Sequence, residues 1–157
     1  MYVIEPEQNN EGRDLADSCL GIGYYDSVMG QSCESFVAKY NNTVIGWASI
    51  YLDRVPLLKS IAVDESFRGK GVSDLLTEHR LDILTEYGYR FVRSYAWTTP
   101  DGKCNSERML KRNKFYCVNV IPNYYSDLTN CPHCGDGNQC QCYAKVYCRS
   151  IKIKNPA

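Results

Sequence analysis

A strand that leads through a glycine-containing loop into a helix constrains the fold of this chain most. Apolar residues dominate positions 57–63, and Gly69 and Gly71 flank Lys70 before a helical pattern begins at Val72. Glycine lets the backbone adopt positive φ and approach a ligand closely. The first amides of the following helix lack an intrahelical partner and carry partial positive charge. The sequence therefore predicts a strand, an anion-binding loop and a helix.

Two common phosphate-binding motifs do not fit this loop. The dinucleotide-binding fingerprint requires a third glycine where this chain has Asp74. The Walker A motif requires Ser or Thr after Gly-Lys, where this chain has Gly71 and Val72. A strand-to-helix turn can also use two glycines without binding a ligand. The helices and strands predicted on either side of the loop therefore have to distinguish an anion-binding loop from a simple turn.

The loop resembles the pyrophosphate loop of the GNAT superfamily, the N-acyltransferases that use acetyl-CoA. The common family form, Arg-Gly-x-Gly-Val/Ile, is matched by residues 68–72. This resemblance implies that amides over 68–73 bind the pyrophosphate, with added charge from Arg68 and Lys70, and that backbone over 61–63 binds the pantetheine where two strands splay apart. The coenzyme residues implied in this way are Ile61, Ala62, Val63, Arg68, Gly69, Lys70, Gly71, Val72 and Ser73.

The order of predicted elements is similar to the GNAT fold across nearly the whole chain. It implies one α/β (α+β) domain over residues 1–157, with a mixed, mostly antiparallel sheet and helices on both faces. Helices are predicted over 11–20, 72–87 and 105–113. Strands are predicted over 2–4, 36–40, 43–52, 57–63, 90–97, 115–121 and 143–153.

A second family landmark, an Asn-containing helix that ends in Gly-Phe, is echoed at 105–115. By this resemblance Asn105 is implied to touch the pantetheine arm. Two positions depart from the family pattern. Lys114 stands where the family usually has glycine, and Leu110 stands where many members place the tyrosine that protonates the departing thiolate.

The sequence does not identify the general base or acid, so the catalytic residues are unknown at this stage. An acceptor amine is mostly protonated at neutral pH, so a carboxylate, a histidine or a water chain has to remove its proton. Asp53, Asp64 and Glu65 lie near predicted strand ends, where acidic residues are usually solvated. His79 falls on an apolar stripe and is expected to pack on the sheet. Tyrosines that could supply the acid are Tyr95, Tyr116, Tyr124 and Tyr147.

Five of the nine cysteines crowd the C-terminal part of the chain. An odd number without an export signal disfavours disulfides. Residues 131–135 form a chelating turn of the zinc-ribbon type, and 140–142 offer a second pair of thiols, although His133 or Cys148 could replace one ligand. Four thiolates leave no open position, so the loop over 131–142 is predicted to hold a structural zinc ion. The predicted ligands are Cys131, Cys134, Cys140 and Cys142.

Charge and hydropathy exclude several classes of protein. The 157 residues carry 18 basic and 18 acidic side chains, which argues against broad binding to a nucleic-acid backbone. No run approaches the roughly 20 apolar residues of a spanning helix, and the first residues do not resemble a secretory signal. A cytoplasmic protein without membrane contact is therefore expected. The tyrosine pairs at 24–25 and 124–125 fit either a homodimer interface or an acceptor slot.

Two functions from different classes remain open. The first is an N-acetyltransferase that moves the acetyl group of acetyl-CoA to a primary amine of a small molecule, peptide or protein. The second is an inactive GNAT-like module that carries zinc and binds protein or nucleic acid. The intact loop over 68–72 favours the enzyme, whereas Leu110 and Lys114 favour the binding module.

Overall fold

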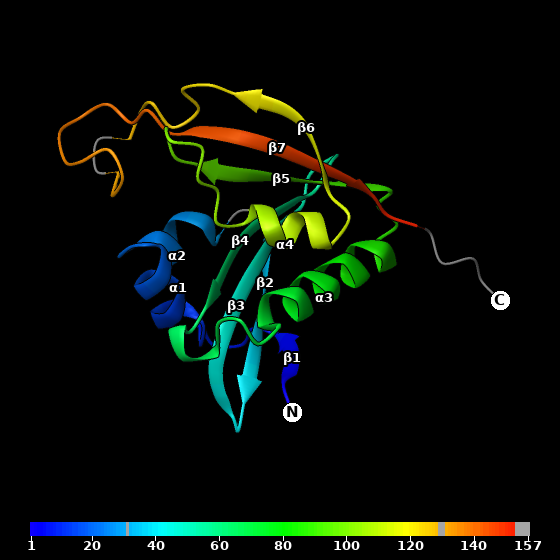
Figure 1. Ribbon diagram of the computed structural model, residues 1–157. Coiled ribbons are helices and arrows are strands. Elements are labelled where there is room, and N and C mark those ends of the chain that lie inside the picture. Colours follow the sequence, from blue (N-terminus) through cyan, green and yellow to red (C-terminus); the bar gives the residue numbers. More distant parts are fainter. Residues whose placement is uncertain (31, 129–130, 153–157) are drawn as a thin grey trace. The chain divides into compact units, whose positions relative to one another are not determined.

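The computed structural model describes residues 1–30, 32–128 and 131–152 (Figure 1). The described residues form two compact units, one over 1–92 together with 150–152, and the other over 93–149. The first unit contains β1 (Val3–Pro6), α1 (Arg13–Leu20), α2 (Tyr24–Val28), β2 (Cys33–Tyr40), β3 (Thr43–Tyr51), β4 (Leu57–Val63), the 3₁₀ turn η1 (Glu65–Phe67) and α3 (Val72–Glu86). The second unit contains α4 (Glu107–Arg112), β6 (Tyr116–Ile121) and most of β5 (Phe91–Thr98) and β7 (Tyr143–Ser150).

The first four strands lie in the order β1-β2-β3-β4, and each neighbouring pair is antiparallel. The predicted hairpin between β2 and β3 is confirmed. Its turn residues Asn41 and Asn42 both have positive φ, of 49° and 63°, and asparagine tolerates this left-handed conformation better than most residues. The hairpin places the centre of β3 between β2 and β4, where its side chains are buried on both faces.

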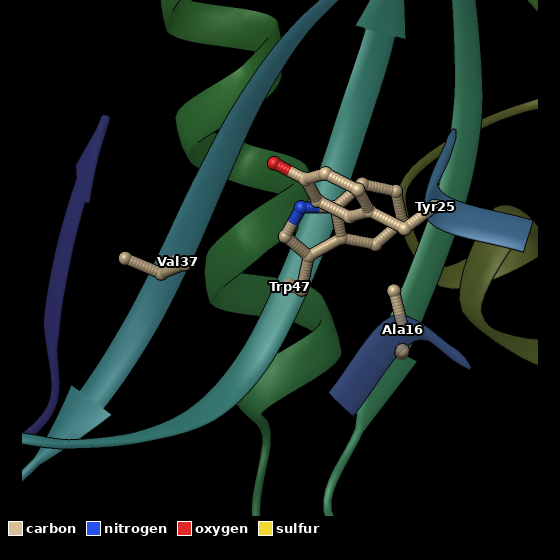
Figure 2. Close-up of a cluster of buried hydrophobic side chains, with 5 residues drawn as sticks. Ala16, Tyr25, Val37 and Trp47 are labelled. Atoms are coloured by element: carbon tan, nitrogen blue, oxygen red, sulfur yellow. The ribbon is translucent and has the colours of Figure 1, made fainter. Parts of the chain in front are cut away.

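One face of this sheet is covered by α1 and α2. Trp47 is fully buried there, and its ring lies 5.6 Å from the ring of Tyr25, centroid to centroid. Figure 2 shows Trp47 and Tyr25 side by side, with Val37 and Ala16 around them. Ala62 on β4 belongs to the same cluster. The apolar cluster therefore joins α1, α2 and three strands.

A carboxylate just after β1 connects this cluster to the start of α1. Glu7 Oε1 accepts hydrogen bonds from the Tyr25 hydroxyl (2.7 Å) and the Ser35 hydroxyl (2.6 Å). It also accepts one from Trp47 Nε1 (3.3 Å), and Glu7 Oε2 accepts one from Gly12 N (2.6 Å). Burial and the bond to Glu7 raise the pKa of Tyr25. Glu7 thus satisfies the polar atoms that the aromatic rings bring into the core.

The opposite face of the same sheet is covered by α3 (Figure 1). A Cβ at Gly46 would lie 3.0 Å from both Leu76 Cδ1 and Val72 Cγ1, so α3 approaches β3 as closely as a glycine allows. His79 packs edge-on against Phe36 with ring centroids 5.0 Å apart, which confirms its expected packing role. Helices therefore lie on both faces of this sheet, as predicted.

A buried arginine joins α3 to β3 and β4 where their pairing is irregular. The register between the two strands shifts after Ser49, which leaves Lys59 as an extra residue on β4. Arg80 Nη1 donates to Ser49 O and Ser60 O (3.1 Å each), and its Nη2 donates to Thr77 Oγ1 (3.1 Å). Burial lowers the pKa of Arg80. The guanidinium supplies hydrogen bonds where the bulge interrupts the ladder.

In the second unit the strands lie in the order β5-β7-β6, and β6 and β7 are antiparallel. The cysteine-rich loop lies between the last two strands, as predicted. The structure ends β7 at Ser150 rather than 153, and Ile153 lies outside the described residues. Helix α4 is shorter than the predicted 105–113. Among the described residues, no helix combines the length and apolar character needed to cross a bilayer.

The end of α4 explains one departure from the family pattern. Phe115 N donates to Leu110 O and Lys114 N donates to Lys111 O (3.0 Å each), which is the hydrogen-bond pattern of a Schellman cap. Lys114 occupies the left-handed position of this cap, with φ of 64°. Glycine is the usual residue there because it has no Cβ to clash. The lysine therefore keeps the backbone geometry at a cost in stability.

We expect Lys114→Gly to stabilise the protein by about 1 kcal/mol, because glycine removes the left-handed strain. Urea denaturation measures the free energy of unfolding. Lys111→Gly is the matched control, since Lys111 lies inside α4. There the same change should destabilise by about 1 kcal/mol. A loss of stability in the Lys114→Gly variant would contradict the assignment of the cap.

Candidate coenzyme site and cysteine cluster

The end of β4 presents backbone groups in two directions. Asp64, the next residue, donates its N–H to Ile45 O on β3 (2.8 Å). In an antiparallel ladder this bond places Val63 in a non-hydrogen-bonded pair. Because the directions alternate along a strand, the backbone N–H and C=O groups of Ile61 and Val63 point away from β3. Those of Ala62 point toward β3.

The carbonyl of Val63 is held by two side chains. Arg68 Nε donates to Val63 O (3.0 Å), and the thiol of Cys19 on α1 lies 3.7 Å from the same oxygen. Arg68 Nη2 lies 3.8 Å from the Cys19 sulfur. The guanidinium thus fastens the loop to the end of β4. Arg68 remains exposed, so its positive charge stays beside the loop.

The loop between β4 and α3 has the conformation that the sequence predicted. Asp64 caps the short η1 turn with its side chain. Gly69 and Gly71 have φ of +74° and +84°, a region that residues with a Cβ rarely adopt. Lys70 is exposed, and its Nζ lies 5.3 Å from the centroid of the Phe67 ring. The two glycines allow the tight reversal that leads into α3.

The start of α3 presents amides without intrahelical partners. Gly71 is the N-cap residue, and no side chain among the described residues caps the helix. The helical ladder begins with Leu75 N donating to Gly71 O (3.1 Å), so the amides of Val72 and Ser73 precede it. A Cβ at Gly69 or Gly71 would meet no described atom within 4 Å. This corner has the open space, backbone donors and positive charge that an anion requires.

Asn105 and Leu110 lie in the second unit. Asn105 is exposed in the turn before α4. Leu110 is fully buried, so packing occupies the position where many family members place the catalytic tyrosine. No hydroxyl can act from this position.

The four tyrosines proposed as alternative acids have different surroundings. Tyr147 is buried, and its hydroxyl donates to Glu107 Oε1 (2.8 Å). Burial and this bond raise the pKa of Tyr147. Tyr116 is exposed on β6. The rings of Tyr95 and Tyr124 stack with centroids 5.4 Å apart. The geometry of the described residues assigns the catalytic acid to none of them.

Sequence reasoning missed the polar cluster around Glu107. Besides Tyr147, the carboxylate contacts Lys145 Nζ at 3.4 Å and Lys111 Nζ at 3.2 Å. The bond from Tyr147 and the contact with Lys111 lower the pKa of Glu107. Tyr147 and Lys145 lie 40 and 38 residues from Glu107 in the chain, so no local pattern predicts this cluster.

The four predicted metal ligands come together in the loop between β6 and β7. Their sulfur atoms all lie within 4.8 Å of one another. The sulfur of Cys142 lies 3.8 Å from that of Cys131 and 3.8 Å from that of Cys134. Cys140 lies 4.0 Å from Cys134. All but Cys134 are buried, so this group of thiols, here called the cysteine cluster, lies inside the second unit.

The two alternative ligands are not part of the cysteine cluster. His133 is exposed, although it lies between two of the cysteines in sequence. Cys148 lies on β7, where it pairs with Tyr116 on β6.

Within the cysteine cluster, burial raises the pKa of Cys142. Burial opposes ionisation of Cys131 too, but the amides of His133 and Cys134 lower its pKa.

The sequence model of the acetyltransferase (GNAT) family matches residues 3–115. The chain belongs to the GNAT acetyltransferase family. The match contains the loop after β4 and the helix after Asn105, and it confirms the predicted family. This family is a class of acetyltransferases. The cysteine cluster lies outside the matched residues.

Individual relatives agree with this membership. An uncharacterized N-acetyltransferase of Chlorobaculum tepidum is 34% identical over 99 residues, which cover 62% of this chain and 61% of the relative. The match thus spans about three fifths of the length of this relative.

Solved structures show the same fold. A GNAT family acetyltransferase from Elizabethkingia anophelis with acetyl-CoA bound has a TM-score of 0.78 at 20% identity, over 96% of this chain and 98% of its own. An IAA acetyltransferase from Bacillus cereus has a TM-score of 0.79 at 18% identity, over 96% and 100%. The α/β fold expected from the element order is confirmed.

Proposed function

We propose that this GNAT acetyltransferase transfers the acetyl group of acetyl-CoA to a primary amine of a small molecule, a peptide or a protein. The observation that carries the proposal is the open corner at the start of α3, with two left-handed glycines and uncapped amides. Family membership and a structural relative with acetyl-CoA bound support the choice of cosubstrate.

In this proposal the coenzyme lies along β4 and the loop that follows it. The pyrophosphate accepts hydrogen bonds from amides over 68–73, and Arg68 and Lys70 add positive charge. The pantetheine pairs with the backbone of Ile61 and with the N–H of Val63, because these groups point away from β3, whereas Arg68 Nε already donates to Val63 O. Ala62 anchors this segment by pairing with β3. Asn105 is proposed to contact the pantetheine arm, on the family resemblance.

The reaction needs mainly correct positioning of the two substrates. The neutral amine attacks the thioester carbonyl, the carbon–sulfur bond breaks, and coenzyme A leaves as a thiolate. The amine loses a proton and the thiolate gains one, so a base and an acid, or water acting for them, complete the transfer. The loop over 68–73 at the start of α3 holds the coenzyme while the acetyl group is transferred.

The inactive binding module is less well supported. One of the two departures that favoured it, Lys114, keeps the left-handed cap that glycine would form. The other, Leu110, removes one acid but leaves the coenzyme corner unchanged. The structure of that corner favours the enzyme.

We also propose a structural zinc ion in the cysteine cluster and a cytoplasmic location. A closed set of four thiolates leaves no position for water or substrate, so acetyl transfer would not pass through the ion. All nine cysteines are free, and a reducing compartment keeps such thiols available for metal.

The experiment that tests the proposed function combines binding with product analysis. Calorimetry with acetyl-CoA measures whether the coenzyme binds. A panel of primary amines, incubated with protein and acetyl-CoA and analysed by mass spectrometry, should yield one class of product that gains an acetyl group. Coenzyme binding without transfer to any amine in a broad panel would support the binding module instead. Absence of coenzyme binding would contradict both the site and the function.

A further inference from the structure

The cysteine cluster has the dimensions of a tetrahedral metal site. With Zn–S bonds of about 2.3 Å, the sulfur atoms of a tetrahedron lie about 3.8 Å apart. The sulfur–sulfur distances here are 3.8, 3.8 and 4.0 Å. A disulfide requires about 2.05 Å, and all nine cysteines of the chain are free. The spacing fits four thiolates around one ion rather than two disulfides.

A backbone amide of the loop points at one of the sulfur atoms. Gln141 N donates to Cys134 Sγ (3.3 Å). The turn that makes this possible is closed by Gly135 N, which donates to Cys131 O (3.0 Å), with Gly135 at φ of +87°. Amide donors favour a sulfur that carries negative charge. The loop is therefore folded to stabilise thiolates.

A tryptophan from β5 brings a further donor to the cluster. Trp97 Nε1 is buried and has no hydrogen-bond partner in the described part of the chain. Trp97 packs against the buried cysteines, among them Cys142. A buried donor without a partner destabilises the fold, so Trp97 is poorly placed beside neutral thiols. A charged sulfur at Cys142 would satisfy it.

The cluster also holds the segment that follows β6. Cys140 N donates to Leu128 O (3.3 Å), and Leu128 and Tyr125 pack against the buried cysteines. Tyr125 stacks on Trp97 with ring centroids 4.1 Å apart and an angle of 14° between the rings. The cysteine cluster thus contacts both β5, through Trp97, and the segment after β6, through Tyr125 and Leu128.

We propose that Cys131, Cys134, Cys140 and Cys142 bind one zinc ion as a closed tetrathiolate, and that Trp97 Nε1 donates a hydrogen bond to the Cys142 sulfur. Binding converts four thiols and Zn²⁺ into a complex of charge −2 and releases four protons to solvent. The amide and indole donors offset this negative charge. This gives the structural zinc proposed above a definite outer shell, in which Trp97 is a positioning residue. The inference does not depend on the acetyl-transfer chemistry.

Metal analysis of the whole chain tests the ligand set. Protein purified under reducing conditions should contain one zinc per chain, and Cys142→Ser should lose it. Cys117→Ser is the matched control, because Cys117 is exposed on β6 outside the cluster, and this variant should keep its zinc. Less than half an equivalent of zinc in the unaltered protein after incubation with Zn²⁺ would overturn the proposal. Stoichiometric iron in place of zinc would overturn the choice of metal.

A thiol-protection measurement keeps this test valid if Cys142→Ser does not fold. In the unaltered protein, alkylation followed by mass spectrometry should leave the four ligand cysteines unmodified until a chelator is added. Rapid alkylation of these cysteines in the zinc-loaded protein would contradict the site. Both measurements are made without acetyl-CoA, so an inactive enzyme would not affect their outcome.

The role of Trp97 is tested through zinc affinity. Trp97→Phe keeps an aromatic ring and removes the N–H, and loss of an outer-shell donor typically weakens metal binding about 10–100-fold. Competition with a chromophoric chelator measures this change. Trp47→Phe, in the other compact unit, should leave zinc affinity unchanged. Equal zinc affinity in the Trp97→Phe variant and the unaltered protein would exclude the proposed hydrogen bond.

Discussion

Replacing Gly71 by aspartate should abolish binding of acetyl-CoA and leave the fold intact. The new carboxylate would stand at the N-cap of α3, where the pyrophosphate is proposed to bind. A unit negative charge about 4 Å from a phosphate costs roughly 4 kcal/mol at an effective dielectric constant of about 20. This corresponds to about a 1,000-fold increase in Kd. Calorimetry with acetyl-CoA measures the change.

The fold should survive because a Cβ at Gly71 meets no described atom within 4 Å, and aspartate tolerates positive φ better than most residues. Gly71→Asn is the matched control, since it adds a side chain of the same shape without charge. It should weaken binding far less than Gly71→Asp. Gly30→Asp places the same charge at another glycine with positive φ and open space, outside residues 68–73. Unchanged coenzyme affinity in Gly71→Asp would contradict the site.

Replacing Trp47 by alanine should cause the largest loss of stability in the first unit. The side chain is fully buried between the rings and methyl groups of its cluster, and its Nε1 donates to Glu7. Removing a buried tryptophan typically costs about 3–5 kcal/mol, which is a large part of the roughly 5–15 kcal/mol that stabilises a domain. Urea denaturation followed by circular dichroism measures the loss.

Two controls separate packing from hydrogen bonding at this position. Trp47→Phe keeps much of the apolar volume and loses only the bond to Glu7, so its loss of stability should be clearly smaller. Tyr124→Ala removes a large aromatic side chain that is nearly half exposed, and it should cost less than Trp47→Ala. A loss below about 1 kcal/mol for Trp47→Ala would show that this cluster does not hold the unit together.

The central strand, loop and helix could be predicted closely because each carries a strong local signal. The strand over 57–63 agrees with β4 residue for residue, and α3 begins at the predicted Val72. Glycines at both ends of the helical pattern marked its limits. The cysteine cluster could also be predicted from the sequence, because two close pairs of cysteines in one loop are typical of a zinc site.

Other features depend on contacts that no local pattern contains. The short α2 and η1 have too few residues to show a helical period, and both were missed. The direction of the backbone groups of Ile61 and Val63 follows from the pairing of β4 with β3, which the sequence does not reveal. The exclusion of His133 and Cys148 from the cysteine cluster also required the folded chain. Catalytic residues stayed unassigned for the same reason.

The two tryptophans of the chain are divided between its compact units, since Trp47 lies in the first and Trp97 in the second. Each single-tryptophan variant therefore carries an intrinsic fluorescent probe that reports on one unit alone. If both probes change at the same denaturant concentration, residues 1–157 melt cooperatively as the one domain that we propose. Separate transitions would instead mean that the first unit, which contains the loop over 68–73, and the second unit, which contains the cysteine cluster, unfold independently.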